Sequence, residues 1–390
     1  MRRSEVAVII AAAALVFVAC SARNGAPASA PEGAGLPLAP AWSATLNVGG
    51  ELQLAAAPGG FIVAAPSGKV LLVRAADGTI GWKKDVGAKI TGSIALAGGA
   101  SPASSGWVAL PVEGAEVVLL PLAGGEPEQR WRLNEPSPIL SSAGPELLAV
   151  SLDGTVRLYS PAAAKTLWET RLPPAAPVQG ALCAGRILIG LASGVLAGLD
   201  AQTGKVQWKK DLGSPLAAAP SCSGHHGVAA TADNFLHALR IHRRSAGFTW
   251  RARSGADPAA PPLLVRKTVL LLSKDTYLYG FGLRNGHLGF RIRLDRRPGP
   301  PAILGDIVLI AGSHAERLDA FRLPYGRSAG GFNLPEGNRF LTPPVISEGK
   351  IAIAVARYGE ETSRLIALAP PAEAGAKGRA GKIQARGTTN

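Results

Sequence analysis

Apolar residues occur along this chain in short runs, and each run is bounded by Gly, Pro, Asp or Ser. The runs from Val70 to Val73 and from Ile187 to Ile189 are examples. Such runs, separated by turn residues, are typical of β-strands. No long stretch shows the 3.6-residue periodicity of an amphipathic helix. The pattern therefore predicts an all-β fold of many short strands.

One unit of this pattern recurs at a period near 40 residues. The segment from Asp77 to Gly87, which contains Trp82, returns from Thr203 to Gly213 around Trp208. An aromatic residue holds the same place in every unit, at Trp42, Trp82, Trp131, Trp168, Trp208, Trp250, Phe290 and Phe332. Several short strands per period of about 40 residues are typical of a four-stranded propeller blade. We therefore predict an eight-bladed β-propeller over residues 41–370.

The fourth unit shows the predicted blade in detail. Its strands are expected at Val178–Leu182, Arg186–Leu191, Val195–Leu199 and Lys205–Leu212, from the innermost strand to the outermost. The marker aromatic residues lie on outer strands, where a large ring buries about 150 to 250 Å² against a neighbouring sheet. We interpret these eight residues as structural.

The two ends of the repeat region indicate how the ring closes. Trp42 lies on a strand with no unit before it, whereas three strands between Pro344 and Leu368 have no marker after them. The N-terminal strand is therefore predicted to complete the last blade.

The N-terminus carries a signal for export. Arg2 and Arg3 precede an apolar stretch of 14 residues, Val6 to Ala19, which is too short to span a bilayer. The stretch leads into Cys20 and Ser21, and this junction resembles the bacterial lipobox. The resemblance implies lipidation of Cys20 and attachment to the inner leaflet of the outer membrane, facing the periplasm. The alternative is a secreted protein with a cysteine near its cleavage site.

The segments that flank the repeats differ from them in composition. Residues 1–19 are the predicted signal peptide, and residues 20–40 are rich in Ala, Pro and Gly, which predicts a flexible tether. Residues 371–390 form a basic tail that is expected to be disordered.

The formal net charge of +14 restricts the class of partner. An exported protein is not expected to bind nucleic acid, so anionic lipid or an acidic protein surface is the expected counterpart. Arginines of the later units, Arg243, Arg244, Arg296 and Arg297, are candidate partner-binding residues. The alternative is that they occupy scattered outward-facing strand positions.

Two further cysteines, Cys183 and Cys222, hold nearly the same place in successive units. An oxidising compartment permits a disulfide, but a bridge requires a Cα separation below about 7 Å, which neighbouring blades can exceed. The sequence leaves this bridge open. It predicts no metal site, because two isolated cysteines and the His225-His226 pair lack further ligands at a suitable spacing.

The segment from Gly198 to Trp208 resembles the PQQ-type propeller repeat, which reads Ala-Leu-Asp-x-x-Thr-Gly-x-x-x-Trp. The resemblance covers about residues 41–370. With the lipobox and eight units, the chain is similar to the BamB family of outer-membrane β-barrel assembly lipoproteins. This implies a non-enzymatic scaffold without cofactor, a monomer within a complex, that binds the POTRA domains of a barrel-assembly protein. The alternative is a propeller that binds another envelope partner or a polysaccharide.

Members of that family bind their partner through loops between middle blades. The equivalent segments here are Glu169–Pro173 and Gly213–Leu216, which makes Arg171, Leu172 and Leu216 candidate contact residues. The second segment departs from the family, because Ser214, Pro215 and Leu216 replace its usual acidic residues.

Quinoprotein dehydrogenases are built from the same repeat and form the rival class. Their site needs oxygen ligands for Ca²⁺, a catalytic Asp and usually adjacent cysteines. The sequence contains no Cys-Cys pair, and Asp153, Asp200 and Asp275 hold turn positions of the repeat. We therefore predict no catalytic residue.

Overall fold

The computed structural model describes residues 38–98, 106–124, 126, 128–133, 139–173, 177–183, 185–294, 298–312, 314–360 and 362–369 of the 390-residue chain. The predicted signal peptide, Cys20, most of the tether and the basic tail lie outside these residues, as do Arg296 and Arg297. Within the described ranges, no helix has the length and apolar character needed to cross a membrane.

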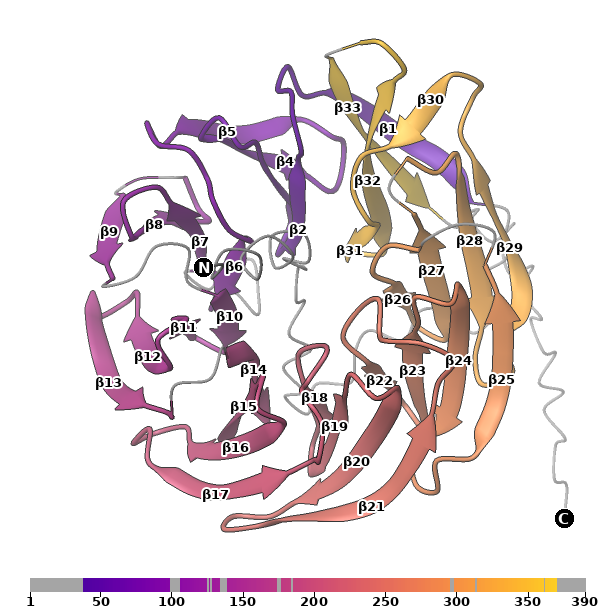
Figure 1. Cartoon of the computed structure of the whole chain (residues 1–390). Helices are drawn as coiled ribbons and strands as arrows, with labels where there is room; N and C mark the ends of the chain where they lie inside the picture. The colour runs from indigo at the N-terminus through magenta and orange to yellow at the C-terminus, as the bar shows by residue number, and fades with distance from the viewer. Residues whose placement is uncertain are drawn as a thin grey trace, which may run out of the picture.

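Antiparallel sheets surround a central axis in chain order, like the blades of a propeller (Figure 1). Blade 1 consists of β2 (Gln53–Ala57), β3 (Gly60–Ala64), β4 (Lys69–Arg74) and β5 (Ile80–Asp85). Blade 2 consists of β6 (Ala95–Ala97), β7 (Trp107–Val112), β8 (Glu116–Pro121) and β9 (Gln129–Arg132). Blade 3 consists of β10 (Ile139–Ala143), β11 (Glu146–Val150), β12 (Thr155–Ser160) and β13 (Lys165–Arg171). Blade 4 consists of β14 (Pro177–Cys183), β15 (Arg186–Leu191), β16 (Val195–Asp200) and β17 (Val206–Asp211).

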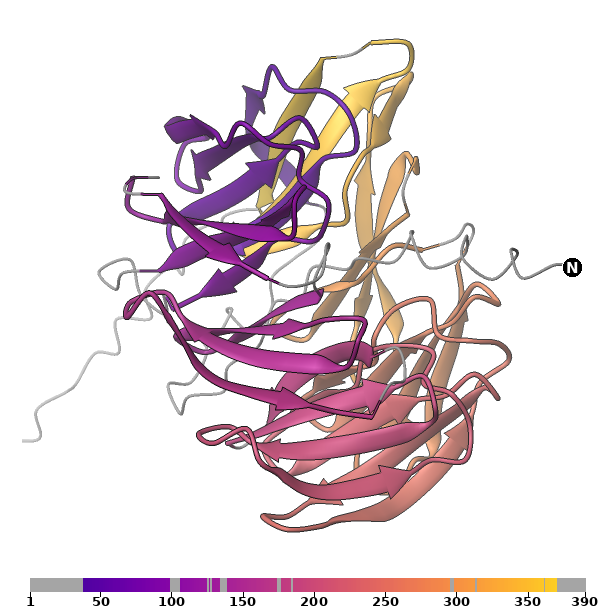
Figure 2. The same ribbon diagram turned by 60° about the vertical axis from the view of Figure 1, so that its left-hand side comes forward.

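The second half of the ring repeats this order, and Figure 2 shows the ring turned so that the first half comes forward. Blade 5 consists of β18 (Ser221–Ser223), β19 (His226–Ala230), β20 (Phe235–Ile241) and β21 (Ala246–Arg253). Blade 6 consists of β22 (Leu263–Val265), β23 (Thr268–Leu272), β24 (Tyr277–Gly282) and β25 (Leu288–Arg293). Blade 7 consists of β26 (Ala302–Leu304), β27 (Ile307–Ala311), β28 (Arg317–Arg322) and β29 (Arg327–Asn333). Blade 8 consists of β30 (Asn338–Phe340), β31 (Val345–Ser347), β32 (Lys350–Arg357), β33 (Ser363–Ala369) and β1 (Ala39–Thr45).

The eight-bladed all-β fold is thus confirmed, and so is its closure. β1 pairs with β33 and places Ala44 opposite Leu365, so the N-terminal strand is the outer strand of the last blade. The innermost strands close the ring as well, because the Ser347 hydroxyl donates a 2.7 Å hydrogen bond to the carbonyl oxygen of Ala57 in blade 1.

The hydrophobic core is divided among the gaps between neighbouring blades. Each buried cluster of the described residues combines side chains from two adjacent blades, and one cluster joins blade 8 to blade 1. The middle strands are buried on both faces, which is why they read as continuous apolar runs.

The marker aromatic residues link each blade to the next. Four indole Nε1 groups donate hydrogen bonds of 2.8 to 3.0 Å to the carbonyl that follows the third strand of the next blade: Trp42 to Ala75, Trp82 to Leu122, Trp168 to Ala201, and Trp250 to Leu283. Trp208 is different, because its ring packs on Gly198 of its own blade and its buried Nε1 has no partner. Ala246, the first residue of β21, takes the place in blade 5 that Gly204 has in blade 4.

Antiparallel order distributes the turns between two rims of the ring. We use rim A for the side with the turns between second and third strands and the connections between blades. Rim B is the side with the turns between first and second strands and between third and fourth strands.

Candidate functional site

Arg171 is one of the arginines that the sequence analysis named as candidate contact residues, and it lies on rim A. It is the last residue of β13 rather than part of a loop, and its side chain is 76% exposed. One guanidinium nitrogen, Nη2, lies 3.9 Å from the Asp153 carboxylate in the turn between β11 and β12. The side chain is therefore held beside this turn and remains accessible to a partner.

The same turn presents an apolar side chain that the sequence analysis missed. Leu152 precedes Asp153 and is 55% exposed. The available signal was a leucine in a polar turn, Ser-Leu-Asp-Gly, between two apolar strands. Leu152 and Arg171 together give this part of rim A an exposed apolar group and a guanidinium, and arginine is enriched in protein interfaces.

The structure places the two leucines predicted as contact residues in the core. Leu172 is 3% exposed and packs between blades 3 and 4. Leu216 is 6% exposed, packs between blades 4 and 5 and forms an isolated bridge with Thr231. Both leucines anchor the connections between blades in the core. Because they are buried, neither side chain is available to a partner.

Hydrogen bonds lower the pKa of Asp153. Its carboxylate accepts from the Thr155 backbone N–H at 2.9 Å and from the Thr155 hydroxyl at 2.8 Å. These bonds are the main cause that lowers the pKa, followed by the positive charge of Arg171. Asp153 therefore stays ionised and keeps Arg171 at the rim.

Arg243 and Arg244, two other predicted contact residues, do not belong to this surface. Arg243 and Arg244 are exposed in the turn between β20 and β21, which is on rim B. They lie on the opposite side of the ring from Arg171, while Arg296 and Arg297 are outside the described residues.

Cys183 and Cys222 meet at the inner strands of blades 4 and 5. Cys183 ends β14 and Cys222 lies in β18, with a Cα separation of 5.8 Å and a disulfide between the two sulfurs. Innermost strands of neighbouring blades are closer than the outer ones, because the blades converge on the axis (Figure 1). The two Cα atoms are therefore within the range that a disulfide requires, which the sequence alone could not show.

The aspartates of the repeat are turn residues, as predicted. Asp153, Asp200 and Asp275 each accept a hydrogen bond from a backbone N–H two or three residues later, at 2.9, 3.1 and 3.2 Å. Among the residues that the structure describes, no group of three or more His, Cys, Asp or Glu side chains could hold a metal ion.

Comparisons with known proteins identify relatives of this fold. The crystal structure of BamB from Moraxella catarrhalis is similar over 85% of this chain and 98% of that one, with a TM-score of 0.66 and 18% identity. The computationally designed protein Ika8 is similar over 83% of this chain and 98% of its own, with a TM-score of 0.67 and 13% identity. At these identities the likeness concerns the fold.

The sequence itself matches a protein family. No curated protein matches the chain significantly. A family model described as "Outer membrane protein assembly factor BamB" matches residues 152–368, more than half of the chain. The chain therefore belongs to the family of the outer membrane protein assembly factor BamB.

Proposed function

We propose that this protein is a non-enzymatic interaction scaffold in the assembly of outer-membrane β-barrel proteins. The observation that carries the proposal is the family match over residues 152–368. The closed ring supports it, since cores between every pair of blades hold the rim turns in fixed relative positions. A rigid surface of this kind suits a scaffold.

The partner-binding surface that we propose consists of Leu152, Asp153 and Arg171 on rim A. Leu152 offers apolar area, and Arg171 offers a guanidinium that pairs with a carboxylate on the partner. The proposed partner is a barrel-assembly protein with POTRA domains. Lipidation of Cys20 would hold the propeller at the periplasmic face of the outer membrane, beside this partner.

Affinity purification of the tagged full chain from mild-detergent membranes tests the proposal. We expect recovery of a POTRA-containing barrel protein at moderate salt. Arg171→Glu and Leu152→Ala should each weaken its binding about tenfold or more. Lys165→Glu is the matched control, because Lys165 is an exposed cation at the opposite end of the same strand, β13.

Two results would contradict the proposal at different levels. Reproducible absence of any barrel-assembly protein would refute the proposed role. Recovery of that partner with equal affinity for the Arg171→Glu and Lys165→Glu variants would refute the surface on rim A and leave the role intact.

A further inference from the structure

Rim B of blades 5 and 6 carries an unbalanced positive charge. Residues 221–294, all of which the structure describes, contain only three carboxylates, Asp233, Asp257 and Asp275, and the blade topology places all of them on rim A. The exposed cations of the same two blades on rim B are Arg240, Arg243, Arg244, Arg266, Lys267 and Arg284. The carboxylates of these two blades are thus confined to rim A, whereas rim B carries cations without any acid.

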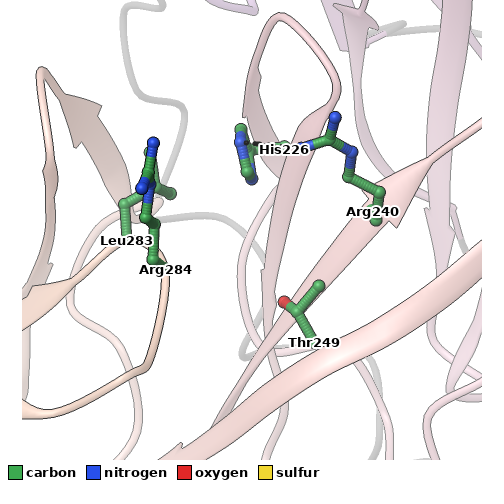
Figure 3. A pocket seen from close by; sticks show the side chains of 5 residues that line it. All are labelled: His226, Arg240, Thr249, Leu283 and Arg284. Atoms are coloured by element: carbon green, nitrogen blue, oxygen red, sulfur yellow. Dashed lines mark hydrogen bonds between the residues drawn. The ribbon is translucent and has the colours of Figure 1, made fainter.

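A pocket of about 290 Å³ opens on this surface between blades 5 and 6. Its lining residues are His226, Arg240, Thr249, Leu283 and Arg284. Figure 3 shows the His226 imidazole between the two guanidinium groups, with Arg240 on one blade and Arg284 on the turn of the next. This volume is near the lower end of the range for small-molecule sites, about 300 to 1,000 Å³.

The neighbouring blade shows what this pocket lacks. In blade 4 the first residue of the second strand, Arg186, is opposite the last residue of the third, Asp200, and the two form a 3.5 Å ion pair. The same register in blade 5 pairs His226 with Arg240. An acid has thus been replaced by a second basic group, so the Arg240 guanidinium has no carboxylate opposite it in the sheet.

The pocket cations have no carboxylate partner among the described residues. Arg240 Nη1 donates to His226 Nε2 over 3.4 Å, and the described part of the chain places no acid within ion-pair distance of Arg240 or Arg284. Partial burial, followed by the positive charges of Arg240, Arg284 and His225, lowers the pKa of His226. The imidazole is therefore neutral at neutral pH, and a bound anion would favour its protonation.

From this geometry we propose that the pocket binds a phosphate group. Guanidinium groups on two walls and an imidazole between them suit a tetrahedral acceptor, whose oxygen atoms point toward several donors at once. A phosphate group offers at least three acceptor oxygen atoms, whereas a carboxylate offers two. The group belongs either to a lipid headgroup or to a small soluble phosphate compound, and the site is independent of the surface proposed on rim A.

Calorimetric titration of the full chain with inorganic phosphate at low, constant salt tests this site. We expect saturable binding at one site, weakened about tenfold or more in Arg240→Gln and Arg284→Gln. Arg243→Gln is the matched control, because Arg243 is an exposed arginine of the same rim that does not line the pocket. Its affinity should change by less than about twofold.

A second measurement separates binding from a loss of folding. Imidazole NMR signals of the histidine-labelled protein, with His226 assigned by a His226→Gln variant, should report a higher pKa of His226 when phosphate is present. Absence of saturable binding would overturn the proposal. An equal loss in Arg243→Gln and Arg284→Gln would also overturn it, because it would indicate diffuse surface charge rather than a site.

Competition between probes then identifies the source of the phosphate. Dihexanoyl phosphatidic acid, a soluble short-chain lipid, is compared with inorganic phosphate on the wild-type protein and on Arg284→Gln. Tighter lipid binding that depends on Arg284 would support the site and assign a headgroup. Equal binding of the two probes would support the site and assign a soluble phosphate compound.

Discussion

The indole Nε1 of Trp168 in blade 3 donates a 3.0 Å hydrogen bond to the carbonyl oxygen of Ala201 in blade 4. This contact joins the outer strand of one blade to the turn after the third strand of the next, at the same place where Trp42, Trp82 and Trp250 make their own. The repeat therefore encodes contacts between blades as well as the blades themselves.

Removal of the hydrogen bond from Trp168 to Ala201 should lower the free energy of unfolding measurably. We expect Trp168→Phe, which keeps a ring but loses the donor, to lower the free energy of unfolding by about 1 kcal/mol. Trp168→Ala, which also removes the packed ring, should lower it by about 3 to 5 kcal/mol. Urea unfolding measures both values, and equal losses in the two variants would show that the hydrogen bond and not the packing dominates.

Two glycines with similar backbone angles distinguish a packing requirement from a backbone requirement. Gly204 has a φ of +70°, and a Cβ there would lie 2.4 Å from the Trp168 ring. Gly213 has a φ of +83° and open space around it. Gly213→Ala should cost about 1 to 2 kcal/mol through backbone strain alone.

Gly204→Ala should cost about 1 to 3 kcal/mol more than Gly213→Ala, because the Trp168 ring must move. The comparison uses the unfolding free energies of both variants under one set of conditions. Equal losses would mean that the ring can shift without cost, against the tight contact in the structure.

The disulfide between Cys183 and Cys222 should stabilise the ring. It links positions 39 residues apart in neighbouring blades, and bridges typically contribute about 2 to 4 kcal/mol. We expect a reductant to lower the unfolding midpoint of the wild-type protein and to leave a Cys183→Ser, Cys222→Ser double variant unchanged. If both thiols of the unfolded, unreduced protein react with an alkylating reagent, the bridge does not form.

The lowered pKa of Asp153 predicts a dependence of stability on acidity. Because the pKa is lower in the folded protein than its ordinary value of 3.8, the carboxylate stabilises the fold above that value. This stabilisation is lost as the pH falls below 3.8 and passes through the lower pKa of the folded protein. Asp153→Asn should thus be less stable than wild type near neutral pH, and the difference should shrink in acid. Thermal unfolding across this range measures it, and a constant difference would contradict the assignment.

The candidate sites were less predictable than the blades. Arg171 was named from the sequence as a candidate contact residue, but Leu152, its exposed neighbour on rim A, was not, because an apolar residue in a turn reads like the end of a strand. Leu172 and Leu216 were expected at the surface and are buried, since connections between blades also supply core side chains. Burial depends on the adjacent blade, which local sequence does not describe.

The sequence alone determined the number of blades, most of the strands within them and the closure by β1, although it missed β30, the fifth strand of blade 8. These features follow from a period near 40 residues and from local runs of apolar and turn residues, so they need no knowledge of distant contacts. Only the tertiary structure decided which rim each turn occupies, how close Cys183 and Cys222 lie, and that Arg284 faces His226 and Arg240 across a pocket. The physical reason is that these relations depend on how neighbouring sheets pack face to face around the axis, which brings together residues from different repeats.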